Sequence, residues 1–378
     1  MMDQSFTCFR ELFPAYSEGI YVNHAAVSPL STVVRQTLLD FWDKRSRLPV
    51  DAYPEWMGEI NRFKAAIAGL IRAKSPERIA MVPNTSYGLN LITTGLEWKA
   101  GHRILLCPME FQANLYPFLN LERHGVHIDW IEPEGGEIRP DDVEKKVTPH
   151  TRLLSISFVQ YLNGFRADLE AIGRVCRKHG VLFIVDGIQG AGAVPVDVEE
   201  CGIDAFVCGG HKWLMWPMGT GFLHTGEKLL GRLKPGIAGW MSAKNRWDFG
   251  SIRLEFADSA EKLEPGTMNI VGILAGQAML ERMTALGIES IYERILGLTD
   301  RLIDGLQNLP VQLITPAARK CRSGIVSFKV ENPDSVIQKL EQNGIFASMR
   351  KGAIRLSPHC TNTMEEMDRI LECLRKIL

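Results

Sequence analysis

Short apolar runs alternate with amphipathic stretches between residues 100 and 210. Compact apolar runs of this kind become strands that are buried on both faces of a sheet. The amphipathic stretches between them predict helices at 112–124, 140–147 and 167–180. This alternation is typical of an α/β domain built on a mostly parallel sheet. The predicted strands are "HRILLCP" (102–108), "VHIDWIEP" (126–133), "TRLLSISFV" (151–159), "VLFIVDG" (181–187) and "DAFVCGG" (204–210).

From about residue 270 the pattern changes. Two long helical patterns, 270–286 and 288–308, precede short strand-like and helical segments, and a last helix is expected at 363–377. Such a mixture is typical of a small α+β domain. We therefore predict an N-terminal segment packed on the small domain (1–18), a large domain (19–260) and a small C-terminal domain (261–378).

The composition excludes several classes of protein. Hydrophobic residues make up 46% of the chain, charged residues 23%, and the net charge is −1, so no nucleic-acid or membrane partner is indicated. We expect neither a signal peptide nor a transmembrane span, since no apolar run approaches ~20 residues. The eight cysteines form no CxxC pair, so no disulfide framework, no metal site and a cytoplasmic location are expected.

Polar residues at the ends of predicted strands are the candidates for chemistry, because open α/β sheets bind ligands there. Asp186 ends "VLFIVD", and Gln189 follows three residues later. A carboxylate there needs a cationic partner, although capping of the next turn is an alternative. Gln160 ends another strand and can contact a ring substituent, or it is simply a polar loop residue.

Two further segments follow predicted strands. Asn84, Thr85 and Ser86 precede a helical run, and free N–H groups at a helix start favour an anion such as phosphate. Plain helix capping is the alternative. Phe111 in "PMEFQANLYPF" lies where a ring can stack on a planar ligand, unless it is a core aromatic.

Lys212 stands in "FVCGGHKWLMWPMGTGFLH", where its neighbours offer no outward route to water. An amine in a partly apolar pocket has a lowered pKa and can form a Schiff base with an aldehyde. A carboxylate opposite suits a protonated pyridine nitrogen. Phosphate cradle, aromatic stack, aspartate and lysine together predict a site for pyridoxal 5′-phosphate.

With these motifs in order, the chain resembles the class V aminotransferase family of fold-type I pyridoxal-phosphate enzymes. This family includes cysteine desulfurases, selenocysteine lyases and isopenicillin N epimerase-like proteins. The resemblance runs from "YVNHAAVSPLS" (21–31) to "IRLSPHCTNTMEEMDRI" (354–370). It implies a large domain with a seven-stranded, mostly parallel sheet, a small α+β domain, and a homodimer with active sites at the interface.

The resemblance also implies roles around the cofactor. Lys212 matches the Schiff-base lysine, and His211 matches a contact on the phosphate side. Asp186 and Gln189 match the contacts to the pyridine nitrogen and the ring oxygen. Phe111 falls where many desulfurase-like members carry a stacking histidine.

The phosphate contacts carry over in the same way. Thr85 and Ser86 match the phosphate-binding pair. Thr267 in "EPGTMN" matches a threonine that reaches the phosphate of the neighbouring subunit. Gly209 replaces a serine that often assists, so the predicted cradle lacks one hydroxyl.

The substrate is expected to be an amino acid, that is, a small molecule, and its side chain is left open. Arg355 matches the arginine that binds its α-carboxylate, and a bidentate fork suits that task. Asn23 and His24 align with the pocket-lining N-terminal motif. Gln160 aligns with kynureninase-like members, while Tyr161 is a competing alignment for the same contact.

One departure bears on the reaction. Desulfurases need a thiol shortly before the carboxylate-binding arginine, but "KLEQNGIFASMRKGAIR" (339–355) contains no cysteine. Cys321 lies far upstream and Cys360 lies after the arginine, so we expect no persulfide. We expect an external aldimine and an α-carbanion, with Lys212 as general base, leading to transamination first, C–S or β-carbon lysis second and epimerisation third. A catalytically inactive binding module is the non-enzyme alternative.

Overall fold

A seven-stranded sheet forms the centre of the computed structural model, which describes residues 2–47, 53–250 and 252–378. The strand order is β2-β8-β7-β6-β5-β3-β4, and β8 is antiparallel to both its neighbours while the other pairs are parallel. All five strands expected between residues 100 and 210 are present. The strands are β2 (Ile79–Val82), β3 (Arg103–Leu106), β4 (His127–Trp130), β5 (Thr151–Ser157), β6 (Leu182–Asp186), β7 (Ala205–Gly209) and β8 (Gly221–Thr225).

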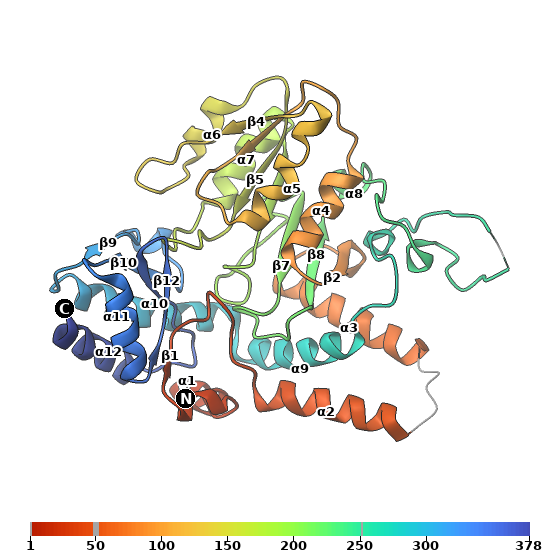
Figure 1. Cartoon of the computed structure of the whole chain (residues 1–378). Helices are drawn as coiled ribbons and strands as arrows, with labels where there is room; N and C mark the ends of the chain where they lie inside the picture. The colour runs from red at the N-terminus through yellow and green to blue at the C-terminus, as the bar shows by residue number, and fades with distance from the viewer. Residues whose placement is uncertain (1, 48–52, 251) are drawn as a thin grey trace.

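Helices cover both faces of this sheet (Figure 1). One face packs on α4 (Thr85–Gly95) and α5 (Tyr116–Leu119), and the other packs on α3 (Tyr53–Leu70), α7 (Leu169–His179) and α9 (Ile270–Leu286). The central strands are therefore mostly apolar, because helices cover most of both faces. Two short helices complete this unit: α6 (Pro140–Lys146) connects β4 to β5, and α8 (Glu227–Leu230) follows β8.

The single helix predicted at 112–124 is wrong. The segment forms two 3₁₀ turns, Gln112–Asn114 and Glu122–His124, on either side of the one-turn helix α5. Pro117 stands in the first turn of α5, where its missing N–H costs nothing. A proline there cannot continue a helix that began five residues earlier.

A second sheet and a separate apolar cluster form the C-terminal unit, as the residues beyond 270 predict. Its four strands run in the order β12-β13-β10-β9 and its helices pack on one another and on the sheet. The elements are α10 (Ile288–Leu306), β9 (Gln312–Leu313), β10 (Val326–Lys329), α11 (Pro333–Gln342), β11 (Ile345–Phe346), β12 (Ser348–Arg350), β13 (Ala353–Leu356) and α12 (Met364–Ile377).

The N-terminal segment contacts this C-terminal unit. It comprises α1 (Met2–Arg10) and β1 (Ile20–Tyr21), and is followed by α2 (Thr32–Arg47). Strand β1 pairs with β11, and the Arg10 guanidinium lies 2.6 Å from Glu366 of α12. Helix α9 packs instead against α2 and α3. The domain boundaries at 18 and 260 stay predictions.

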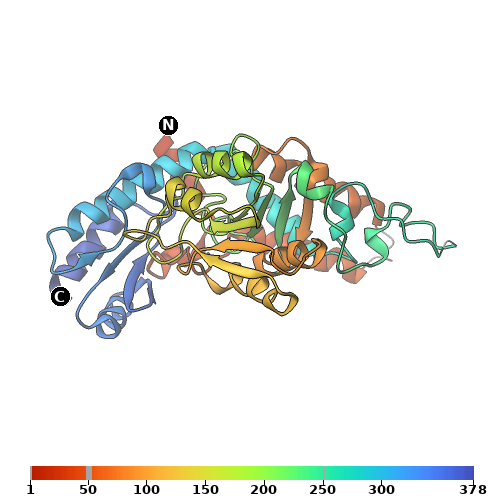
Figure 2. The ribbon, with the colours of Figure 1, turned by 90° about the horizontal axis from the view of Figure 1, so that it is seen from above.

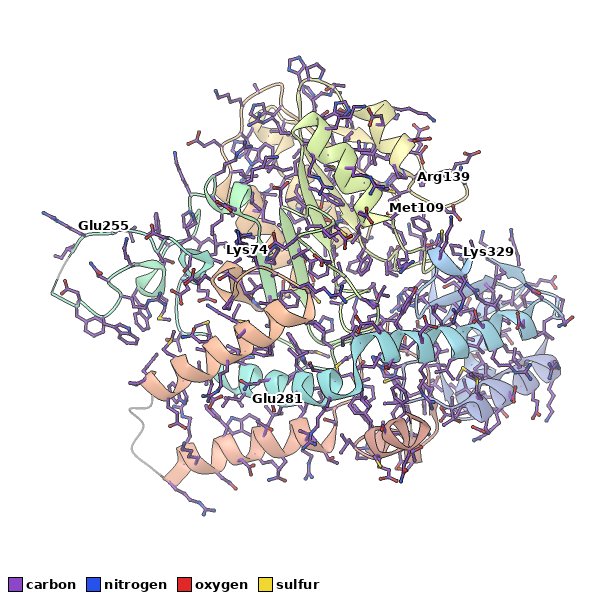
Figure 3. The ribbon with its side chains drawn as sticks, turned by 180° about the vertical axis from the view of Figure 1, so that it is seen from behind. Lys74, Met109, Arg139, Glu255, Glu281 and Lys329 are labelled. Carbon is purple, nitrogen blue, oxygen red and sulfur yellow. The ribbon has the colours of Figure 1, made fainter. Side chains whose placement is uncertain are left out.

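A loop-rich segment, residues 236–250 and 252–256, projects from the large unit at the end opposite the small one (Figures 1 and 2). Figure 3 places Glu255 on this projection and Lys329 at the other end of the molecule. Within the described ranges no helix has the length and apolar character needed to cross a membrane. The candidate residues lie between these two ends, at the carboxyl edge of the central sheet.

Candidate active site

Lys212 and Asp186 meet at the carboxyl edge of the central sheet. Asp186 is the last residue of β6, and Lys212 follows the end of the neighbouring parallel strand β7 by three residues. Because both strands point the same way, their ends bring the carboxylate and the amine to one place. The two groups interact electrostatically, as the sequence pattern predicts.

The environment shifts the pKa of both groups toward their neutral forms. Burial raises the pKa of Asp186, although the Ile188 N–H donates to its Oδ1 at 3.0 Å, and the charge of Glu110 raises it further. Burial also lowers the pKa of Lys212. The negative charge of Asp186 raises this pKa, and the positive charge of Arg355 lowers it further. An amine with a lowered pKa gives up its proton more readily and can act as nucleophile and base.

Phe111 lies beside this lysine rather than in the core. Its ring centroid is 5.8 Å from Lys212 Nζ, and Tyr161 packs edge-on against it at 5.4 Å. The side chain is 46% exposed, which rules out the alternative of a core aromatic. An open aromatic face next to a reactive amine suits a planar ring ligand.

Glu110 is a site residue that the sequence analysis missed. Its buried carboxylate accepts hydrogen bonds from the Ser157 N–H (2.9 Å), Asn114 Nδ2 (3.1 Å) and Gln160 Nε2 (2.6 Å). Burial raises its pKa, and its charge acts on Asp186. The available signal was an acid directly after a strand in "PMEFQ". Gln160 is thereby held at the site, with its Oε1 buried and without a partner among the described residues.

The start of α4 leaves backbone donors free. Asn84 caps the helix by accepting from the Tyr87 N–H at 2.8 Å, while the N–H groups of Thr85 and Ser86 have no partner among the residues the structure describes. Thr85 Oγ1 accepts from the Gly209 N–H at 3.1 Å, which ties this helix start to the end of β7. Free N–H groups at the positive end of a helix dipole fit a phosphate.

His211 precedes the lysine and is partly buried. Burial and the positive charge of Lys212 lower its pKa to about 4. The imidazole is therefore neutral at neutral pH, with one nitrogen able to donate a hydrogen bond. Its proposed contact on the phosphate side is compatible with that form and stays a prediction.

Gln189 ties the lysine segment to the N-terminal region. Its Nε2 donates to the Ala25 carbonyl at 3.0 Å, and its Oε1 accepts from Trp213 Nε1 at 2.9 Å. One N–H of the amide remains for another partner, since Nε2 carries two. The contact to a ring oxygen expected for Gln189 stays a prediction, as does the choice between Gln160 and Tyr161.

His24 lies behind the lysine. Its imidazole is fully buried, with Nε2 2.9 Å from the Tyr16 hydroxyl and Nδ1 2.7 Å from Ser28 Oγ. Ser28 in turn donates to the Lys212 carbonyl. This series of hydrogen bonds holds the backbone of Lys212 in place. Asn23, one residue earlier, has a buried Oδ1 without a partner in the described part of the chain, so its amide is available to a ligand.

Arg355 is a buried cation with unused donors. It is 1% exposed, donates from Nη1 to the Tyr161 carbonyl (2.9 Å) and from Nε to Ser348 (3.3 Å), and has no acidic partner among the described residues. Its Nη2 is buried and has no hydrogen-bond partner in the part of the chain that the structure describes. Burial, with the charge of Arg350 adding to it, lowers its pKa to about 9. A carboxylate satisfies such a group in charge and in hydrogen bonding.

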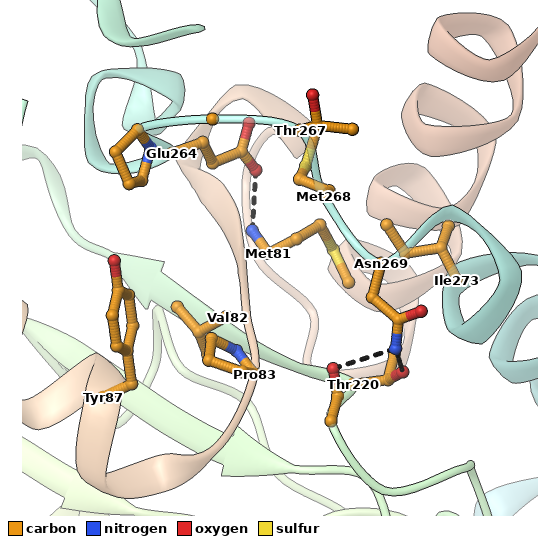
Figure 4. Close-up of a pocket in the computed structure, with 13 residues that line it drawn as sticks. Met81, Val82, Pro83, Tyr87, Thr220, Glu264, Thr267, Met268, Asn269 and Ile273 are labelled. Carbon is orange, nitrogen blue, oxygen red and sulfur yellow. Dashed lines mark hydrogen bonds between the residues drawn. The ribbon is translucent and has the colours of Figure 1, made fainter. Parts of the chain in front are cut away.

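Thr267 lies apart from these residues. It is exposed, its Oγ1 is 2.9 Å from the Tyr53 hydroxyl, and it lines a pocket of about 320 Å³ with Tyr87 and Thr220 (Figure 4). Neither Lys212 nor Asp186 lines that pocket. A single chain does not bring Thr267 to the lysine, and its proposed role across subunits stays a prediction.

The segment before Arg355 is a tight hairpin. Strands β12 and β13 are joined by Lys351 and Gly352 alone, with φ of 48° and 76°. Two successive positive φ values are typical of a two-residue hairpin turn, for which glycine is favoured. The hairpin contains no cysteine, and Cys360 is fully buried, which raises the pKa of its thiol.

The fold and this site define a pyridoxal-phosphate-dependent enzyme of fold type I. The residues fit the cofactor: Lys212 offers a reactive amine, Asp186 a buried carboxylate, Phe111 an open ring face, and α4 free N–H groups. The family model "Aminotransferase class-V" matches residues 20–370, and the chain belongs to that family.

Relatives and solved structures agree with this assignment. A probable cysteine desulfurase of Methanothermobacter thermautotrophicus is 28% identical and covers 97% of each chain, and the uncharacterized aminotransferase YcbU of Bacillus subtilis is 24% identical over 96% of each. The apo cysteine desulfurase of Thermococcus onnurineus superposes with a TM-score of 0.89 at 26% identity, covering 97% of this chain and 96% of that one. The cystine C–S lyase C-DES, in complex with its product cysteine persulfide, superposes with a TM-score of 0.90 at 25% identity, covering 97% of this chain and 99% of that one.

Proposed function

We propose that this enzyme is a class V aminotransferase that takes the amino group of an α-amino acid whose carboxylate is bound by Arg355. The observation that carries the proposal is the β12–β13 hairpin, which presents Arg355 to the lysine and offers no thiol beside it. A persulfide-forming desulfurase needs such a thiol. The likeness to homologues named cysteine desulfurase therefore supports the use of pyridoxal phosphate in this protein more than it supports the formation of a persulfide.

Each side chain has a defined task in this reaction. Pyridoxal phosphate, when bound, supplies an aldehyde for the amino group and a ring that accepts electrons. Asp186 and Phe111 hold the ring, the α4 N–H groups hold the phosphate, and Arg355 orients the substrate carboxylate. Lys212 Nζ would take the proton from the α-carbon and deliver it to the carbon derived from the cofactor aldehyde, which its lowered pKa allows.

Phe111 favours transamination over side-chain elimination. A lyase benefits from an acid that protonates the departing atom, and many desulfurase-like relatives carry a histidine at this position. A phenyl ring holds no proton to give. Lys212 can carry a proton between carbon atoms by itself, so transamination needs no second acid there.

A C–S lyase is the second candidate. The observation that favours it is the likeness to C-DES, a cystine C–S lyase, over 97% of this chain at a TM-score of 0.90. A cystine-type substrate carries its own sulfur leaving group as a persulfide of low basicity, so it departs without help from an enzyme thiol or acid. The hairpin without cysteine is compatible with this reaction as well.

A single-turnover experiment separates the two reactions. The yellow holoenzyme is mixed with one amino acid at a time, and mass spectrometry identifies the product and the cofactor left behind. We expect stoichiometric pyridoxamine phosphate and an oxo acid. Unchanged pyridoxal phosphate together with ammonia, sulfide or a side-chain fragment would establish a lyase instead. A colourless protein that does not take up the cofactor would favour the binding-module alternative.

We further propose that the enzyme is a homodimer in which Thr267 of one subunit completes the phosphate site of the other. The support is the projecting segment, residues 236–250 and 252–256, on which several large apolar side chains are exposed, because clustered exposed apolar residues mark interaction surfaces. Light scattering should give about twice 42.3 kDa, and a monomer at micromolar concentration would contradict the proposal. The exposed apolar residues are Ile237, Trp240, Trp247, Phe249, Ile252 and Leu254.

A further inference from the structure

A second arginine lies on the same face of the hairpin as Arg355. In the β12–β13 ladder, Ser348 is paired with Arg355 and Arg350 with Ala353. Paired residues and residues two apart share one face of an antiparallel ladder. Arg350 and Arg355 are therefore diagonal neighbours on the face that carries Arg355 toward the site, a separation of about 7–8 Å, or somewhat less between their Cβ atoms.

Arg350 also lacks an acidic partner in the described part of the chain. Its one hydrogen bond runs from Nη1 to the neighbouring Met349 carbonyl at 2.7 Å, and the side chain is half-buried. Other arginines of the C-terminal unit are paired, for example Arg319 and Arg322 with Asp300. The half-buried guanidinium of Arg350 has four N–H donors that make no hydrogen bond to the described residues, and it lies near the Arg355 guanidinium. Burying two such cations costs free energy unless an anion binds between them.

The charge of Arg350 reaches the catalytic lysine. It lowers the pKa of both Arg355 and Lys212. Such an effect requires proximity, because Coulomb interactions fall with distance and are screened by water. The guanidinium groups of Arg350 and Arg355 thus face one site. A single α-carboxylate that pairs with Arg355 leaves Arg350 without an anionic partner among the described residues.

We propose that Arg350 binds a second acidic group, so that the substrate is an α-amino acid with an acidic side chain, of the size of aspartate or glutamate. This inference rests on the proposed function and specifies its substrate. Arg355 takes the α-carboxylate through its buried Nη2, and Arg350, which directly precedes the turn of the hairpin, takes the side-chain carboxylate. The diagonal spacing suits two carboxylates separated by a short carbon chain.

The competing arrangement places both arginines on the same α-carboxylate. In that case Arg350 contributes to every amino acid equally. In the proposed arrangement it contributes only to substrates with a second acidic group. Comparing acidic amino acids with their amides therefore separates the two, because aspartate and asparagine differ at the side-chain group alone.

The test uses Arg350→Gln in the holoenzyme with Lys351→Asn as matched control. Lys351 is the next residue, is exposed, and has a positive φ that asparagine tolerates, so this control removes one charge from the same hairpin. For Arg350→Gln we expect kcat/KM with aspartate or glutamate to fall about 10- to 100-fold, the usual loss for a charged hydrogen bond. Asparagine, glutamine and alanine should change less than about 3-fold, and the control should match wild type.

In the kinetic test, two results would overturn the inference: equal losses on acidic and neutral amino acids, or a wild-type enzyme with no preference for acidic ones. Binding of succinate and glutarate against butyrate, followed by the spectrum of the bound cofactor, gives a readout that needs no turnover. Tight dicarboxylate binding that Arg350→Gln abolishes supports the inference even if the reaction is not transamination. Equal affinity for mono- and dicarboxylates contradicts it and leaves the proposed aminotransferase standing.

Discussion

The ionisation of Lys212 depends on burial and on the charges placed around it. Burial and Arg355 lower its pKa, while Asp186 raises it. Removal of the amine should therefore cost both the covalent link to the cofactor and the proton transfer. Arg355 and Asp186 shift the pKa of the same amine in opposite directions. Substituting either residue therefore changes the ionisation of Lys212 as well as that residue's own contact with a ligand.

Lys212→Ala should lower turnover by more than about 100-fold, because general acid–base catalysis alone contributes ~10²–10⁴. It should also remove the absorbance of the lysine-bound cofactor, which titration of the variant with pyridoxal phosphate would measure. Lys234→Ala is the control, since that exposed lysine pairs with Glu97 far from the site. Normal turnover in Lys212→Ala would disprove the assignment.

At the scale of elements, a buried ion pair holds the segment that leads to Thr267. Lys64 of α3 and Glu264 lie 2.9 Å apart, and both side chains are almost fully buried. Glu264 also accepts from the Met81 N–H at 2.7 Å, which joins the segment to β2 (Figure 4). The pair is therefore a link between a helix, a sheet strand and the loop that carries Thr267.

Lys64→Met should lower the free energy of unfolding by about 3–5 kcal/mol, because it leaves a buried carboxylate without its cation. The double variant with Glu264→Gln should recover most of this loss, since glutamine can still accept from Met81. Urea denaturation of the four proteins of the cycle measures both effects. Additive losses in the double variant would show that the two residues do not act as a pair.

Strand ends were predictable from sequence, while contacts between distant segments were not. Apolar runs mark β5, β6 and β7, and the parallel order expected of such runs is enough to place Asp186 and Lys212 at one edge. Glu110 was missed because its partners, Ser157 and Gln160, come from another strand end. The hairpin register that aligns Arg350 with Arg355 was equally hidden, since periodicity shows which residues alternate but not which residues pair.

For the whole molecule, several fully or partly buried histidines are kept neutral by the fold. Burial lowers the pKa of His24, His211, His224 and His359 in each case. An unfolded chain would protonate them near pH 6.5. The folded state therefore binds fewer protons than the unfolded state at mildly acidic pH, and these residues make stability fall as the pH falls. Asp186 and Glu110, whose pKa values are raised, act in the opposite direction.

His224 allows this linkage to be tested away from the site. It lies on β8, it is 1% exposed, and burial, with the charge of Arg78 adding to it, lowers its pKa to about 3. Between pH 6.5 and about 3 the unfolded chain binds one proton more at this residue than the folded chain does. The free energy of unfolding should fall by about 1.4 kcal/mol per pH unit on its account.

In His224→Leu this contribution disappears, while every other titrating group is shared with wild type. Denaturant unfolding of both proteins at several pH values between 6 and 4.5 gives the free energy of unfolding as a function of pH. The difference between the two slopes then measures the proton that His224 binds on unfolding. We expect the variant to lose less stability per pH unit, whatever its stability at pH 7. Parallel slopes would mean that His224 is protonated in the folded protein, and the neutral histidine inferred from burial on β8 would be wrong.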